Sequence, residues 1–76
     1  MDPKAVARRA LEAAFRTDLA RVYAIYVAAL AEAGDDAARQ RQAERRFRKA
    51  VETGWTAFAK ACEIVDGLGG QAPGPK

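Results

Sequence analysis

Large apolar residues recur at helical spacing through residues 4–33. They are separated by alternating steps of three and four, so they fall on one side of a helix with about 3.6 residues per turn. No glycine or proline interrupts this range, and strong helix formers dominate it. The pattern predicts one long helix whose large apolar face comprises Leu11, Phe15, Leu19, Val22 and Tyr26, flanked by Ile25 and Leu30.

Residues 36–66 show a second helical pattern, with apolar residues on one side and charged residues on the other. The charged side contains Arg41, Arg45, Arg48, Lys49, Glu52, Lys60 and Glu63. This helix is therefore expected to bury one face and to expose the other. Its apolar face comprises Ala43, Phe47, Ala50, Val51, Gly54, Phe58, Ala61 and Val65, with Trp55 and Cys62 at the edge.

Aspartate, proline and glycine mark the boundaries of these helices. Asp2 is a suitable N-cap, and Pro3 fits the first helical position, where its missing amide would have had no partner. Gly34 supplies a C-terminal glycine, and Asp36 can cap the helix that follows. Two long helices with so short a connection must lie antiparallel. The predicted fold class is all-α, a two-helix antiparallel hairpin with helices at about 3–33 and 36–66.

The hairpin is expected to occupy residues 1–68. Gly67 followed by Leu68 predicts a left-handed terminal turn with its hydrophobic contact. Residues 69–76 are rich in glycine and proline, which predicts a flexible tail.

Two local features favour breaks instead of unbroken helices. Thr17 and Asp18 offer a helix start inside the first range. Gly54 costs about 1 kcal/mol in a helix interior. In the antiparallel pairing, however, Gly54 is expected to lie near Phe15, where the missing side chain leaves room for the ring.

A second apolar line runs along the first helix, nearly opposite the large residues. Its members are small or β-branched and recur at steps of four and three, as in a coiled-coil seam. Because alanine is so common here, composition alone can also produce such a line. The uncharged stretch 22–31 argues against that, since a helix that is apolar all round is normally buried. The line, which we call the outer seam, consists of Val6, Ala10, Ala13, Thr17, Ala20, Ala24, Val27 and Ala31.

One hairpin cannot cover both sides of its first helix. A chain of 76 residues without a disulfide also has little core to oppose its conformational entropy. We therefore expect a partner helix at the outer seam. A second copy would give a dimeric four-helix bundle with the first helix inside, and another helical subunit is the alternative partner.

An arginine-rich segment at the start of the second helix is the strongest candidate for contact with nucleic acid or an acidic partner. Its cations span about three turns and can neutralise several phosphates. In the other interpretation they form a solvated helix back, with ion pairs such as Asp35 with Arg39 and Glu44 with Arg48. A dimer of such hairpins resembles plasmid RNA-binding hairpin regulators in architecture alone. The segment contains Arg39, Arg41, Arg45, Arg46, Arg48 and Lys49.

Composition gives little support to other classes of function. The chain is half apolar, has a net charge of +3, and contains one cysteine and no histidine. Without histidine, Cys62 has no partner base of the usual kind, and a small buried hydrophobe is the expected role. The sequence carries no metal or cofactor motif. A ligand pocket lined by Tyr23, Tyr26, Phe47 and Trp55 is less favoured than a core position for these rings.

The sequence thus predicts a non-catalytic interaction or assembly module. We expect no cofactor, no metal and no small-molecule ligand. The polar amino terminus, the lone cysteine and the absence of a bilayer-length apolar run favour a cytoplasmic location and argue against a membrane span.

Overall fold

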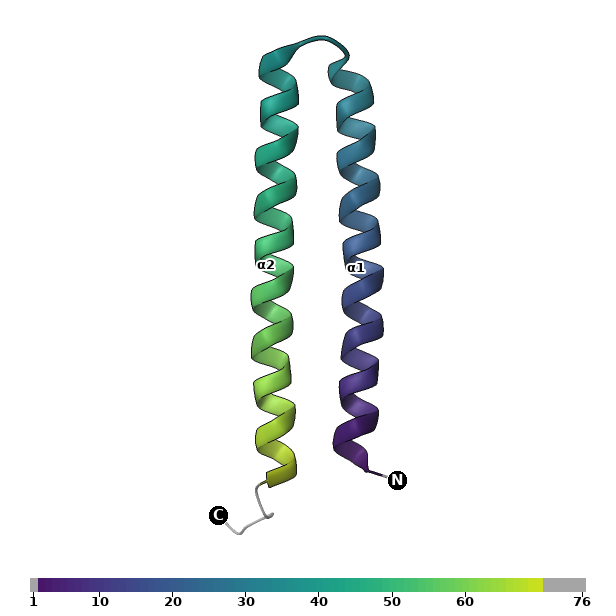
Figure 1. Cartoon of the computed structure of the whole chain (residues 1–76), viewed down its shortest axis with the longest axis vertical. Coiled ribbons are helices and arrows are strands. Elements are labelled where there is room, and N and C mark those ends of the chain that lie inside the picture. The colour runs from purple at the N-terminus through teal and green to yellow at the C-terminus, as the bar shows by residue number, and fades with distance from the viewer. Residues whose placement is uncertain (1, 71–76) are drawn as a thin grey trace.

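The chain folds as two long antiparallel helices joined by a tight turn (Figure 1). The computed structural model describes residues 2–70. Helix α1 spans Pro3–Ala33 and helix α2 spans Ala37–Gly70, and the two pack against each other along their length. The described residues form no strand. The all-α antiparallel hairpin predicted from the sequence is confirmed.

Helix α1 begins where the cap and proline place it. The carboxylate of Asp2 accepts a hydrogen bond from the backbone N–H of Lys4 at 3.0 Å, and Pro3 occupies the first helical position. This satisfies one of the amides that a helix start leaves without a partner. Helix α1 then runs unbroken through Thr17 and Asp18.

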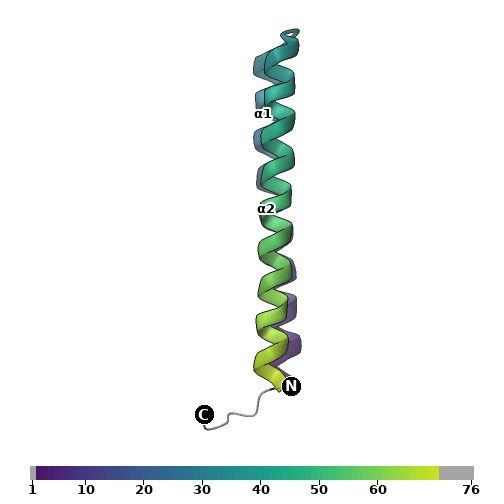
Figure 2. The same ribbon diagram turned by 90° about the vertical axis from the view of Figure 1, so that its left-hand side faces the viewer.

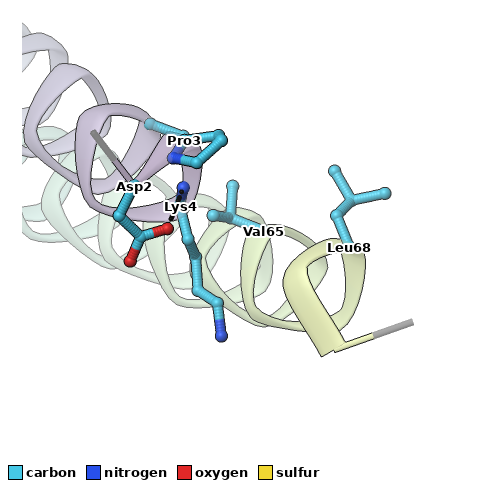
Figure 3. A pocket seen from close by; sticks show the side chains of 6 residues that line it. Asp2, Pro3, Lys4, Val65 and Leu68 are labelled. Atoms are coloured by element: carbon cyan, nitrogen blue, oxygen red, sulfur yellow. Dashed lines mark hydrogen bonds between the residues drawn. The ribbon is translucent and has the colours of Figure 1, made fainter. Parts of the chain in front are cut away.

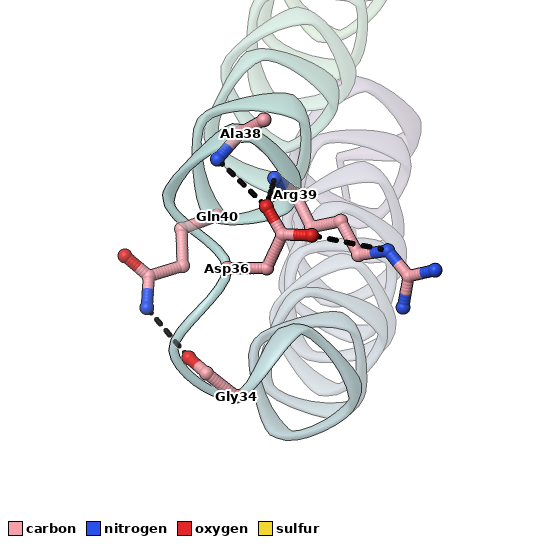
Figure 4. A network of polar contacts seen from close by, with 5 residues as sticks. All are labelled: Gly34, Asp36, Ala38, Arg39 and Gln40. Carbon is pink, nitrogen blue, oxygen red and sulfur yellow. Dashed lines mark hydrogen bonds and ion pairs between the residues drawn. The ribbon is translucent and has the colours of Figure 1, made fainter.

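The turn is held by hydrogen bonds from both helices. Gly34 has a φ of +53°, which favours glycine, and its N–H donates to the carbonyl of Leu30 at 3.2 Å. Asp36 accepts from the backbone N–H groups of Ala38 and Arg39 at 3.0 and 3.2 Å (Figure 4). The side-chain amide of Gln40 donates to the carbonyl of Gly34 at 2.6 Å. These bonds join the end of α1 to the start of α2.

Helix α2 ends later than the sequence suggested. The expected left-handed turn at Gly67 is wrong, because among residues 2–70 only Gly34 has a positive φ and α2 continues to Gly70. Val65 and Leu68 line a shallow depression against the first turn of α1 (Figure 3). We attribute the extra turn to this neighbour. Of the predicted tail, residues 69–70 belong to α2, and residues 71–76 lie outside the described range.

Gly54 lies inside α2 at a close approach to α1. A Cβ atom added there would be 3.2 Å from Oδ2 of Asp18 and 3.6 Å from Cε1 of Phe15. The expected proximity to Phe15 is confirmed. The closer neighbour, however, is the Asp18 carboxylate.

The hairpin is one helix layer thick (Figure 2). Its principal extents are 59 × 22 × 11 Å. Within residues 2–68 only Ala33 and Ala43, 6% and 5% exposed, are buried apolar residues. The expected helix contact forms, with Phe15 stacked on Phe58 and Tyr26 on Phe47 at centroid distances of 4.7 and 4.6 Å. These rings are only half-buried, because each helix has a single neighbour.

Candidate functional site

The most conspicuous surface feature is large apolar side chains that face solvent. Seven of them on the described part of the chain are at least 44% exposed. Single exposed apolar residues are normal, whereas a set this large on a chain this small indicates an interaction surface. The seven are Val6, Tyr23, Ile25, Val27, Trp55, Ile64 and Leu68.

Ile25 marks one broad face of the hairpin. It was expected to flank the contact with the second helix, but it is 63% exposed, so that expectation is wrong. Pairing with α2 turns Ile25 aside from the helix contact, and it lines an open groove there with Arg46. We call this side the alanine face, because the remaining lining of the groove includes Ala29, Ala43 and Ala50.

Tyr23 and Trp55 lie on the opposite broad face. At about 100° per residue, Tyr23 is about 200° from Ile25 around α1, and Trp55 is about 180° from Arg46 around α2. Tyr23 is 60% exposed and Trp55 is 59% exposed. We call this side the aromatic face.

Trp55 projects from the ring cluster between the helices. Its ring centroid is 5.6 Å from that of Phe15 and 6.1 Å from that of Phe58. Nearer the turn, a shallow depression on the same face has charged residues at its margin. Its lining is Tyr26, Phe47, Val51, Glu44, Arg48 and Glu52.

The outer seam predicted from the sequence lies along α1 on the side away from α2. All of its residues are exposed in the hairpin. The seam is therefore accessible along its length, and contact with a partner there stays a prediction. Its members are Val6, Ala10, Ala13, Thr17, Ala20, Ala24, Val27 and Ala31.

The arginine-rich segment is exposed on the first half of α2. All six cations, Arg39 to Lys49, are exposed, and they do not share one face, since Arg46 lines the alanine groove and Arg48 the aromatic depression. Arg39 pairs with Asp36 at 3.7 Å and not with Asp35 as expected.

Gln40, an expected contributor of hydrogen bonds to a phosphate, is engaged at the turn instead. Within residues 2–70 the remaining ion pairs are Arg8 with Asp66 and Lys60 with Glu63. The expected pair of Glu44 with Arg48 does not form.

The remaining candidates for chemistry stay separate. Cys62 is a half-buried free thiol. Tyr26 and Phe47 stack in the helix contact while Tyr23 and Trp55 face solvent, so the four rings line no common pocket. Among residues 2–70, no three His, Cys, Asp or Glu side chains gather as a metal site would require. No helix in that range is long and apolar enough to cross a membrane.

Sequence reasoning missed two contacts between the helices. Arg8 donates to Asp66 at 3.1 Å, linking the start of α1 to the end of α2. The carboxylate of Asp18 lies against Gly54, although Asp18 was assigned to the helix edges and backs. Both follow from the helix register, which is set by pairs such as Phe15 with Phe58.

The chain matches no known protein family, no curated protein and no solved structure. The functional argument therefore rests on the surfaces of the hairpin.

Proposed function

We propose that this chain is a non-catalytic assembly module, acting as a homodimeric four-helix bundle or as a helical subunit of a larger complex. The observation that carries this proposal is the small extent of burial. Only Ala33 and Ala43 are buried apolar residues within residues 2–68, while Tyr23, Ile25 and Trp55 are more than half exposed. A second helical layer would remove these side chains from water, and each fully buried large residue contributes about 1.5–3 kcal/mol.

Sedimentation velocity at several protein concentrations tests the proposal. The full chain has a mass of 8.2 kDa. We expect a species of at least twice that mass at micromolar concentration, or a stable complex with a helical protein when the chain is isolated from its own cells. A cooperatively folded monomer that copurifies with no protein would contradict both forms of the proposal.

A second candidate function is nucleic-acid binding by the arginine-rich segment. It is favoured by one observation: within residues 2–70, the charged groups of Arg41, Arg45, Arg46, Arg48 and Lys49 have no carboxylate within 4.0 Å. Exposed cations without ion pairs are available to phosphates.

Binding to a labelled RNA hairpin and a DNA duplex at increasing salt tests this second function. Phosphate contacts predict an affinity that falls steeply with salt, and the double variant Arg45→Glu with Arg46→Glu should abolish binding. The matched control is Arg9→Glu with Arg16→Glu, which makes the same charge change on α1. Equal loss in both variants would indicate net charge alone and would count against a site on α2.

A further inference from the structure

We propose that a second copy of this chain packs on the aromatic face and buries Trp55 at the centre of a symmetric dimer. This inference rests on the proposed assembly function and deepens it by naming the partner and the face. The argument has three parts: the direction of the apolar stripes, the area available and the position of Trp55 along the hairpin.

Both helices carry a stripe of large apolar residues onto the aromatic face. In each stripe the steps are four, three and four, which is the spacing of a coiled-coil seam. The stripes are Leu19, Tyr23, Tyr26 and Leu30 on α1, and Val51, Trp55, Phe58 and Cys62 on α2.

The turning of both stripes to one side is what a four-helix bundle requires. Each helix of such a bundle contacts two neighbours that lie in different directions, and its apolar arc must cover both. Towards the alanine face, α1 presents only Ile25 as a large exposed apolar residue in its central part, and α2 presents Arg46. The aromatic face is therefore the apolar side of the layer.

The broad face also has the area that a stable dimer needs. A stable interface buries about 800 Å² on each partner. The flat side of the hairpin extends over 59 × 22 Å, which exceeds that requirement. The outer seam is one helix wide, and a copy docked there would place four helices in a row and leave the rings of α2 uncovered.

Trp55 lies at the middle of the hairpin. Its neighbour Gly54 is level with Asp18, which is the midpoint of α1. In a symmetric face-to-face pair, a residue at mid-length lies level with its own copy whether the two hairpins run parallel or antiparallel. Trp55 is thus covered in either orientation, and tryptophan at the centre of an interface commonly carries much of the binding energy.

The single tryptophan reports on this contact directly. Fluorescence of the unmodified full chain is recorded during dilution across the range in which sedimentation shows the dimer dissociating. We expect the emission maximum to move to longer wavelength as the dimer separates, because Trp55 becomes exposed to water. A dimer that dissociates with no change in Trp55 emission would overturn the inference.

Three consecutive positions on α1 distinguish the surfaces. Tyr23→Glu places a charge on the aromatic face, Ala24→Glu on the outer seam and Ile25→Glu on the alanine face. Tyr23 and Ile25 are 60% and 63% exposed, so their replacement disturbs the hairpin equally little. We expect Tyr23→Glu to raise the dimer dissociation constant about tenfold or more, and the other two variants to change it by less than about threefold.

The outcomes separate this inference from the proposed function. If the unmodified chain dimerises but Ala24→Glu or Ile25→Glu separates it while Tyr23→Glu does not, the aromatic face is the wrong surface and the assembly function stands. If the unmodified chain is a folded monomer at every concentration, the homodimer and this inference both fail. Equal helical content of the three variants by circular dichroism shows that a loss of dimer is not a loss of fold.

Discussion

An aspartate precedes each helix and fixes where it begins. Asp2 caps α1 through the N–H of Lys4, and Asp36 caps α2 through the N–H groups of Ala38 and Arg39. Such caps can be predicted from sequence, because they depend on a few consecutive residues. The close approach of Asp18 to Gly54 depends on pairing between residues far apart in the chain, and sequence periodicity does not determine it.

Replacing Asp36 by alanine should destabilise the hairpin by about 1 kcal/mol. The variant loses two hydrogen bonds to backbone amides and the ion pair with Arg39. Urea unfolding followed by far-UV circular dichroism at one fixed protein concentration measures the change. Asp35→Ala is the matched control, since it removes the same charge one residue away without removing the cap, and a similar loss in both variants would count against the cap.

Gly54→Ala should stabilise the hairpin by about 0.5–1 kcal/mol. Alanine has the higher helix propensity, and its Cβ would make an ordinary contact with Phe15 at 3.6 Å. The Asp18 carboxylate, at 3.2 Å, must move by a few tenths of an ångström, which the end of a side chain can do. Thermal unfolding measures the effect, and a lower midpoint than that of the unmodified chain would show that Asp18 is held in place.

At the scale of the helices, spacing and breakers predicted both elements and the turn between them. Helix α1 covers the expected range 3–33, whereas α2 extends four residues past its expected end at residue 66. A glycine near a helix end is compatible with either a left-handed cap or a further helical turn. The neighbouring first turn of α1, lining a depression with Val65 and Leu68, distinguishes the two and is a tertiary feature that spacing cannot supply.

The two end glycines should therefore respond differently to alanine. Gly34→Ala should cost about 1 kcal/mol or more, because Gly34 has a φ of +53°. Gly67→Ala should be neutral or slightly stabilising, because Gly67 is helical and no atom lies within 4 Å of the added Cβ. Paired urea unfolding curves check this, and a destabilising Gly67→Ala would restore the left-handed turn.

For the whole molecule, the sequence predicted which residues face the other helix but not how the two broad faces differ. Periodicity placed Phe15, Tyr26, Phe47 and Phe58 in the helix contact, as the structure shows. The sides to which Ile25 and Trp55 turn depend on the rotation of each helix about its axis, which the helix contact sets. The candidate site predicted from sequence was therefore the outer seam, and the aromatic face became visible only in three dimensions.

The central claim is that this thin hairpin depends on association for its stability. The most direct test is urea unfolding of the purified full chain, followed by far-UV circular dichroism, at protein concentrations spanning a factor of about one hundred. If folding and association are coupled, the unfolding midpoint rises with concentration, because dimer stability is inseparable from protomer concentration. A cooperative transition whose midpoint is the same at every concentration would show that the hairpin is stable alone and would contradict the account.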